Sequence, residues 1–272
     1  MTDDATSGRL AQAEMYEAHM VPALFAPWAP VLLARATPRP GDRVLDVATG
    51  TGAVARQVAP LVGAAGRVVG LDPSPAMLAV ARGVPAPPGA PVEWVEGNGQ
   101  ALPFADASFD LVVCQQGLQF FPDRALGLRE MRRVLAAGGR VGILVWQAIE
   151  RQPAYAALDR AMARQAGGGR LTAPFALGEP EELTRLLTGA GFSDVATETV
   201  AGEVRFASAE GWVRRSILGS AAAVPELARL DAPGMEALIA AVEAEMGETL
   251  RRYVDGDGLA LPSVASVGTG TA

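Results

Sequence analysis

The sequence has no lysine, one cysteine and one histidine among its 272 residues. Without lysine, a Schiff base and the phosphate-binding lysine of a P-loop are excluded. The single cysteine, Cys114, excludes an internal disulfide framework and a zinc site built from several thiolates. The single histidine, His19, excludes a metal site that needs two imidazoles, and we expect no metal.

Long apolar runs and an excess of positive charge are also missing. The longest uncharged stretch near the N-terminus, from Ala18 to Ala34, contains three prolines, so we expect no membrane-spanning helix there. The net charge of −7 and the pI of about 4.9 argue against nucleic acid or an anionic membrane as the main partner. The acidic start, with Asp3 and Asp4, is unlike a signal peptide, and we expect a cytoplasmic protein. The richness in Ala, Gly, Pro and Arg is typical of a bacterial genome rich in G and C.

Half of the residues are hydrophobic, which is enough for a large core. After Pro40, short apolar runs alternate with segments whose apolar residues recur at helical spacing. The predicted strands cover 43–47, 67–71, 92–95, 109–114 and 140–146, and the predicted helices cover 53–61, 75–82 and 124–135. Because the strands lack polar alternation, we expect a parallel sheet buried on both faces, in a doubly wound α/β fold.

The flanks of this region differ in pattern. Residues 10–35 predict one or two helices interrupted at the prolines. Beyond Glu150, the pattern predicts helices at 154–164 and 181–188 separated by a loop at 167–169, a strand at 193–200, helical structure over 209–253 and a strand at 259–267. We expect one domain overall, with a helical lid at 1–37, a core at 38–150, and a C-terminal half at 151–272 that carries helical caps at about 151–190 and 208–252.

The glycine loop after the first predicted strand is the most informative segment. Gly50 and Gly52 allow the backbone to approach a ligand at the carboxyl edge of the sheet. The next strand ends at Asp72, about 20 residues further on, where a carboxylate can accept both hydroxyls of a ribose. Together these features predict a nucleoside ligand. Asp46 stands just before the loop and would repel a pyrophosphate, which favours a nucleoside with an ammonium group, such as S-adenosylmethionine.

Five ordered motifs carry a resemblance to a known family. They are Asp46-x-Ala48-x-Gly50-x-Gly52, Asp72 to Leu78, Gly97 to Phe104, Ser108-Phe109-Asp110, and Val134-Leu135-x-x-Gly138-Gly139. With these motifs the chain resembles the class I S-adenosylmethionine-dependent methyltransferases, in particular the ubiquinone and menaquinone biosynthesis C-methyltransferases, over about residues 40–147. The resemblance implies a mostly parallel, seven-stranded, Rossmann-like sheet with an N-terminal helical lid and a helical cap insertion.

The resemblance also implies a set of cofactor-binding residues. They are Asp46, Ala48, Thr49, Gly50, Gly52, Asp72, Pro73, Met77, Gly97, Asn98, Gly99 and Gln115. Asp46 and the loop are expected to hold the methionine part, Asp72 the ribose, and Met77 and Asn98 the adenine. Ala48 replaces a glycine often seen in the family, and Asn98 stands where the family usually has aspartate. The amide oxygen of Asn98 can still accept a hydrogen bond from the adenine amino group.

For the methyl acceptor, we expect a roof built from the flanking helices. Tyr16 and His19 are three residues apart and would share one face of an α-helix beside Glu17, so these three are the candidate catalytic residues, with His19 as the base. The expected substrate pocket comprises Phe25, Trp28, Gln116, Phe120, Phe175 and Trp212, with Phe206 nearby. Its aromatic character favours C- or O-methylation of an aromatic or lipophilic small molecule from quinone or secondary metabolism. Arg170, Arg205, Arg214 or Arg215 could orient an acidic group on it.

Several alternatives stay open at this point. An NAD(P)-dependent oxidoreductase shares the glycine loop and Asp72, and a methyltransferase fold can persist as a catalytically silent binding module. Asp46 could cap a helix, Met77 could be ordinary core, and His19 could be a surface residue. We expect Cys114 to be a small buried hydrophobe, and Arg132 and Arg133 to form a solvated helix face. A monomer and a homodimer both remain open.

Overall fold

The structure is a computed structural model of the chain. It describes residues 2–85, 87–166, 171, 173–209, 211–220, 227 and 229–272, with side chains from Ser7 onward. The expected loop at 167–169 and Arg170 lie outside the described residues.

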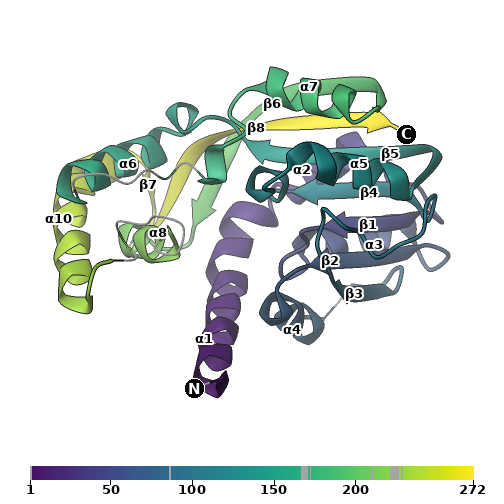
Figure 1. The fold of residues 1–272 in the computed structure, drawn as a ribbon. Helices are drawn as coiled ribbons and strands as arrows, with labels where there is room; N and C mark the ends of the chain where they lie inside the picture. Colours follow the sequence, from purple (N-terminus) through teal and green to yellow (C-terminus); the bar gives the residue numbers. More distant parts are fainter. Residues whose placement is uncertain are drawn as a thin grey trace. The chain divides into compact units, whose positions relative to one another are not determined.

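The centre of the fold is a sheet whose strands follow the order β3-β2-β1-β4-β5-β8-β6 (Figure 1). Five strands of the N-terminal half, β1 (Arg43–Val47), β2 (Arg67–Asp72), β3 (Val92–Glu96), β4 (Phe109–Gln115) and β5 (Leu135–Trp146), pair in parallel. The last four residues of β1 and the last five of β2 are buried, as the apolar runs predict. The expected α/β class with a mostly parallel sheet is confirmed.

Helices connect the parallel strands because each crossover must return the chain to the same edge of the sheet. They are α3 (Ala53–Val62) after β1, α4 (Pro75–Gly83) after β2, and α5 (Arg124–Val134) before β5. Each has an apolar face that is buried, such as Val54, Val58 and Val62 of α3. The chain between β4 and α5 contains only the short η2 (Leu118–Phe120).

Two C-terminal strands complete the sheet, and the one beside β5 runs antiparallel to it. β8 (Gly258–Thr271) ends beside the start of β5, where the Ala272 N–H donates to Gly139 O (2.9 Å) and the Gly138 N–H donates to Ala272 O (3.3 Å). β6 (Ser193–Phe206) forms the edge beyond β8, and the short β7 (Val254–Asp255) pairs with β8 off the main path. The seven strands of the main path agree with the expected number, and β7 is the eighth strand, which the sequence pattern did not predict.

The chain divides into two compact units. The first comprises Met1–Val145, Glu179–Thr199 and Ser266–Ala272, and the second comprises Trp146–Gly178 and Val200–Ala265. These limits differ from the expected domain boundaries, because α7 (Pro180–Gly189) belongs to the unit that holds the parallel strands and not to a cap.

The N-terminal region of the first unit contains three consecutive helices. They are α1 (Thr2–Met15), the π-helix η1 (Tyr16–Phe25) and α2 (Ala29–Ala36). The expected interruption is found at Pro27, but Pro22 lies inside η1. Within this unit α1 packs against α4, and η1 packs against α1 and α3.

The second unit is mainly helical. It contains η3 (Ile149–Arg151), α6 (Pro153–Ala166), η4 (Ala173–Phe175), α8 (Trp212–Ser220) and α10 (Ala232–Arg251), and α10 packs against both α6 and α8. The predicted helices at 154–164 and within 209–253 are therefore found. Among the described residues, no helix combines the length and the apolar character that crossing a membrane requires.

Candidate functional site

The site is built at the carboxyl ends of β1, β2 and β3, where three loops meet. The loop after β1 takes a left-handed backbone at Ala48 (φ 58°), Gly50 (φ 57°) and Gly52 (φ 90°). The Thr49 N–H donates to Leu71 O at the end of β2 (3.0 Å), which fixes this loop to the neighbouring strand. Gly52 then caps the N-terminus of α3, so the loop leads directly into a helix.

The Asp46 side chain holds the glycine loop and the start of α3 through hydrogen bonds. Its side chain is buried, and Oδ2 accepts hydrogen bonds from the Thr49 hydroxyl (2.5 Å) and from the Ala55 N–H in the first turn of α3 (3.0 Å). Burial raises the pKa of Asp46 to about 7, because the loss of hydration outweighs the two hydrogen bonds that favour the charged form. Asp46 therefore does cap the N-terminus of α3, as one of the alternatives expected, through its Oδ2 atom. This contact does not use Oδ1, which is left for another partner.

Asp72 joins the end of β2 to the glycine loop. Its Oδ2 accepts from the Gly50 N–H (2.8 Å) and its Oδ1 accepts from the Ser74 N–H (2.9 Å). Burial raises the pKa of Asp72 above its usual range, and the two backbone N–H groups act in the opposite direction. The following Pro73 is exposed, and Met77 is half-buried one turn into α4, with its N–H on the Ser74 hydroxyl (3.3 Å).

The third loop follows β3 and contains Gly97, Asn98 and Gly99. The Gly97 N–H donates to Asp72 O (3.1 Å), which brings this loop to the end of β2. Asn98 is exposed, and its Oδ1 accepts from the Gln100 N–H (2.9 Å) within its own turn. Gly99 is buried where a Cβ would lie 2.4 Å from the Phe121 ring, so the turn packs too closely for a larger residue.

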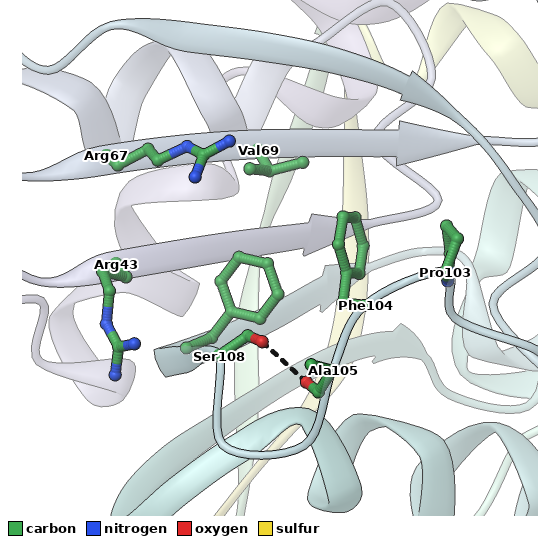
Figure 2. A pocket seen from close by; sticks show the side chains of 8 residues that line it. Arg43, Arg67, Val69, Pro103, Phe104, Ala105 and Ser108 are labelled. Carbon is green, nitrogen blue, oxygen red and sulfur yellow. Dashed lines mark hydrogen bonds between the residues drawn. The ribbon is translucent and has the colours of Figure 1, made fainter.

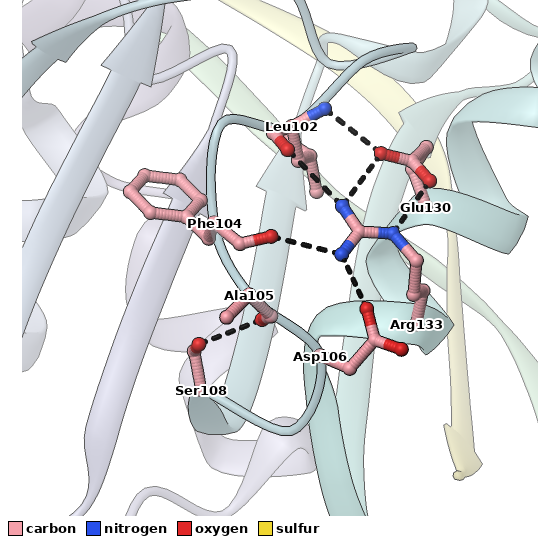
Figure 3. Close-up of polar contacts among 7 residues, drawn as sticks. All are labelled: Leu102, Phe104, Ala105, Asp106, Ser108, Glu130 and Arg133. Atoms are coloured by element: carbon pink, nitrogen blue, oxygen red, sulfur yellow. Dashed lines mark hydrogen bonds and ion pairs between the residues drawn. The ribbon is translucent and has the colours of Figure 1, made fainter.

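Arg133 of α5 holds the continuation of this third loop. Its guanidinium donates to Phe104 O (2.8 Å) and Leu102 O (3.1 Å), and it pairs with Glu130 and Asp106 (Figure 3). These carboxylates raise the pKa of Arg133 above its usual range, and Arg133 holds the pKa of Glu130 below its own. The expectation of a merely solvated face is therefore wrong for Arg133, because its partners other than Glu130 lie 27 to 31 positions away, beyond what helix periodicity reveals.

Tyr16 of η1 lies over the glycine loop. A Cβ placed on Gly50 would lie 3.7 Å from the Tyr16 hydroxyl, and the Tyr16 ring stacks on Phe25 with centroids 5.1 Å apart. Burial raises the pKa of Tyr16 above its usual range, and the nearby carboxylates of Asp72, Glu17 and Asp46 raise it further. The phenol is therefore neutral at physiological pH and is able to donate a hydrogen bond.

The structure does not bring the three candidate catalytic residues together. Glu17 turns toward α3, where Oε1 accepts from the Arg56 guanidinium (2.9 Å), and His19 is exposed. The shared face expected for Tyr16 and His19 is wrong, because it assumes α-helical spacing and η1 closes with an i→i+5 bond from the Ala26 N–H to Val21 O (2.8 Å). In such a wide turn, residues three apart point in different directions.

Two glutamines follow β4 at the same edge of the sheet. Gln115 is buried, its Nε2 donates to Phe25 O (2.8 Å), and its Oε1 is buried without a hydrogen-bond partner among the described residues. Gln116 is also buried, has a left-handed backbone (φ 56°) and accepts at Oε1 from Gln119 (2.7 Å). Phe25 and Gln115 thus lie together beside Tyr16, which none of the sequence motifs indicates.

The expected pocket residues are distributed over both units. In the first, Trp28 is core at 3% exposed, whereas Phe120 is 55% exposed. In the second, Phe175 and Trp212 contact the Tyr155 ring, with the Tyr155 and Trp212 centroids 5.3 Å apart, and Phe206 contacts Trp212. Ion pairs engage two of the candidate arginines, Arg205 with Asp255 and Glu203 and Arg214 with Glu236, and Arg215 donates to Ser208 O.

A surface cavity of about 240 Å³ opens at the other end of the strands (Figure 2). Arg43 and Arg67, which begin β1 and β2, line it together with Phe104 and Phe109. Both arginines are paired, with Asp110 and Glu93 respectively. Because ligands of open parallel sheets bind at the carboxyl ends of strands, this cavity is not the candidate site. Among the described residues, no group of three metal-ligating side chains is found.

Comparisons with known proteins agree with this geometry. A methyltransferase domain family matches residues 44–139. A ubiquinone/menaquinone biosynthesis C-methyltransferase of Xylella fastidiosa is 35% identical over 192 residues, which cover 65% of this chain and 76% of the relative.

Two solved structures share the fold. A Bacillus halodurans protein assigned as a methyltransferase has a TM-score of 0.58 at 22% identity, covering 89% of this chain and 97% of that one. The Haemonchus contortus phosphoethanolamine N-methyltransferase 2, solved with S-adenosylhomocysteine, has a TM-score of 0.55 at 18% identity, covering 97% of this chain and 57% of that one. The glycine loop, the acidic residues at two strand ends and this relationship lead to one conclusion: the chain belongs to the S-adenosylmethionine-dependent methyltransferases, in the family of the ubiquinone/menaquinone biosynthesis C-methyltransferases.

Proposed function

We propose that this methyltransferase acts on carbon or oxygen of a small aromatic or lipophilic acceptor, with a quinone-like ring as the leading candidate. The observation that carries the cofactor part of the proposal is the meeting of Tyr16 and Asp72 at Gly50, with the Asp46 carboxylate near enough to raise the pKa of Tyr16. The relationship to quinone-modifying C-methyltransferases favours this acceptor class. The acidic, lysine-free composition favours a small molecule over nucleic acid.

The residues present fit S-adenosylmethionine. Asp72 is a buried acceptor with lone pairs to spare for the two ribose hydroxyls, and Asp46 supplies negative charge for the ammonium group. Gln115 Oε1, which is buried without a described partner, is an acceptor ready for a donor from the ligand. The left-handed turn at Gly50 brings the backbone close to the methionine part. Ala48, Thr49, Gly52, Pro73, Met77 and the loop 97–99 complete the proposed cofactor set.

S-adenosylmethionine supplies an electrophilic methyl group on a sulfonium, so the protein's task is mainly to align the acceptor and keep water out. The neutral Tyr16 phenol donates a hydrogen bond and cannot accept a proton at neutral pH. Glu17 is engaged by Arg56, and His19 is exposed. These placements favour an acceptor that is already nucleophilic, such as an enolised or phenolic ring, and His19 as a base stays a prediction.

Transfer of labelled methyl from S-adenosylmethionine to a panel of quinols, phenols and indoles tests the proposal. Label on a quinol or phenol supports it, and label confined to amines or sugars contradicts the acceptor class. A chain that binds S-adenosylhomocysteine yet labels nothing would favour the binding-module alternative. Calorimetric titration with NADH addresses the oxidoreductase alternative, for which tight binding is required.

A further inference from the structure

Arg56 connects the glycine loop to the N-terminal π-helix. It lies one turn into α3, and its two terminal nitrogens point to different elements. Nη1 donates to Thr51 O in the loop, and Nη2 donates to Glu17 Oε1 in η1 (2.9 Å). A single guanidinium therefore fixes the loop and η1 in relation to each other.

The Glu17–Arg56 pair is shielded from water. The side chains are 21% and 11% exposed, and Glu17 Oε2 is buried without a hydrogen-bond partner among the described residues. An exposed pair such as Arg35–Glu198, at 30% and 59%, holds its residues weakly because water and salt screen it. Removing one partner of a shielded pair leaves the other charge uncompensated, so the geometry depends on both residues.

Other contacts fix the opposite end of η1. Gln115 Nε2 donates to Phe25 O (2.8 Å), and Gln57 Nε2 donates to Ala26 O (2.9 Å). At the N-terminal end, the described side-chain contact to α3 is the one between Glu17 and Arg56. Glu17 is adjacent to Tyr16, so the ion pair also sets the rotation that places the Tyr16 hydroxyl over Gly50.

We propose that Glu17 and Arg56 are positioning residues whose ion pair latches η1 onto the glycine loop, holds Tyr16 over Gly50 and thereby sets the affinity for the methyl donor. The proposal rests on the cofactor site proposed above. It replaces the role of Glu17 as an acceptor-contacting residue, because the carboxylate is directed at α3 and pairs there with Arg56.

The test compares Glu17→Gln, Arg56→Gln and the exchange Glu17→Arg/Arg56→Glu by calorimetric titration with S-adenosylhomocysteine. Each single variant should lose about 10-fold in affinity, a coupling within the usual range between linked sites. The KM for S-adenosylmethionine should rise in parallel, while kcat at saturation changes little. The exchanged pair should bind more tightly than Arg56→Gln but more weakly than the wild type, because a carboxylate at position 56 can form the ion pair but cannot donate to Thr51 O. Glu198→Gln, which breaks the exposed pair in the same unit, serves as the matched control and should bind as the wild type does.

Wild-type affinity in Glu17→Gln and Arg56→Gln would overturn the latch. A loss in Arg56→Gln alone, with no effect of Glu17→Gln, would also overturn it, because Arg56 would then act without the ion pair, through Thr51 O or through the ligand. If the exchanged pair does not fold, Arg56→Lys replaces it, and the retained charge should restore part of the affinity. The latch is read from binding, so failure of the wild type to methylate any acceptor would count against the proposed function and not against the latch.

Discussion

At the residue scale, Asp46 makes cofactor affinity depend on pH. Its pKa is about 7 in the ligand-free chain, and a cationic amino group beside it favours the carboxylate. We therefore expect S-adenosylhomocysteine to bind about 10-fold more tightly at pH 8 than at pH 6, since below its pKa the group must first lose a proton. Calorimetry in buffers of different ionisation enthalpy should show that proton being released. Asp46→Asn should bind more weakly and without this pH dependence.

The raised pKa of Asp46 affects folding stability in the opposite direction: raising the pH favours cofactor binding but lowers the stability of the ligand-free chain. A carboxyl whose pKa is raised on folding contributes stability that is present at low pH and is lost as pH rises through the folded value. For Asp46 the window extends from about pH 4, the unfolded value, to about pH 7. Relative to Asp46→Asn, the ligand-free wild type should therefore lose stability between these values, as measured by urea unfolding. An equal difference at pH 4 and pH 7 would contradict the assignment.

Substitution of Tyr16 should weaken cofactor binding, whereas substitution of His19 should have little effect on catalysis. Tyr16→Phe removes a hydroxyl that lies over Gly50, and we expect it to weaken S-adenosylhomocysteine binding by about 5- to 10-fold, the value of one hydrogen bond. His19→Gln changes an exposed side chain, so kcat, KM and the pH profile should stay within about 2-fold of the wild type, since surface changes are usually neutral. A loss of turnover in His19→Gln with intact binding would restore His19 as the base.

The sequence indicates the role of a residue when that residue belongs to a motif of nearby residues with the same function. Asp46, Gly50 and Asp72 stand at strand ends within recognisable motifs, and the structure places all three together. Arg56 was missed because its partner Glu17 is 39 positions away and belongs to no motif. Tyr16 reaches the site, but the reason given for it, α-helical spacing to His19, fails in a π-helix.

At the element scale, the start of α3 depends on Gly52. Asp46 of β1 is paired with Gly70 of β2, which is paired with Trp94 of β3. The Trp94 ring extends over Gly70 as far as Gly52. A Cβ on Gly52 would lie 2.2 Å from this ring at a left-handed backbone (φ 90°). Gly52→Ala should therefore cost about 2 to 4 kcal/mol, which combines the backbone penalty with overpacking. It should also weaken S-adenosylhomocysteine binding.

Gly41→Ala is the matched control for that substitution. Gly41 has nearly the same φ (88°), but a Cβ there meets nothing within 4 Å. Chemical unfolding should show a loss of only about 1 kcal/mol, from the left-handed backbone alone. Equal losses in the two variants would mean that the Trp94 ring moves away at no cost.

The strands and helices of the parallel half were predictable because their apolar periods are regular. The predicted ends of β1 coincide with the observed ones, and those of α3 and α4 differ by one residue. The π-helical form of η1 was not predictable. Pro22 indicates only that one α-helical hydrogen bond is missing, and it does not show whether the helix ends there or continues as a π-helix. β5 begins at Leu135, five residues before the predicted start, and Gly138 and Gly139, which the apolar pattern left out of the strand, form its antiparallel contact with Ala272.

At the scale of the whole molecule, the predicted cofactor residues all belong to one of the two units. Asp46, Asp72, Gln115 and the loop 97–99 lie in the first unit, as do Tyr16 and η1. Composition could not reveal this division, since β6 and β8 each contribute residues to both units and no linker separates them. If the cofactor binds in the first unit alone, its binding should protect amides of that unit and not those of the second.

Hydrogen exchange with and without S-adenosylhomocysteine should map that consequence. At a concentration of 100 Kd the ligand adds about 2.7 kcal/mol to openings that release it, so amides of η1, the glycine loop and Ser74 should exchange up to about 100-fold more slowly. Amides of α10 in the second unit should be unchanged, and equal protection there would contradict the assignment of cofactor contacts to the first unit. Adding a quinol acceptor should then slow exchange further near Phe25 and Gln116, which are predicted acceptor contacts within the first unit. If a quinol that is methylated leaves both segments unaffected, these two predicted contacts are wrong.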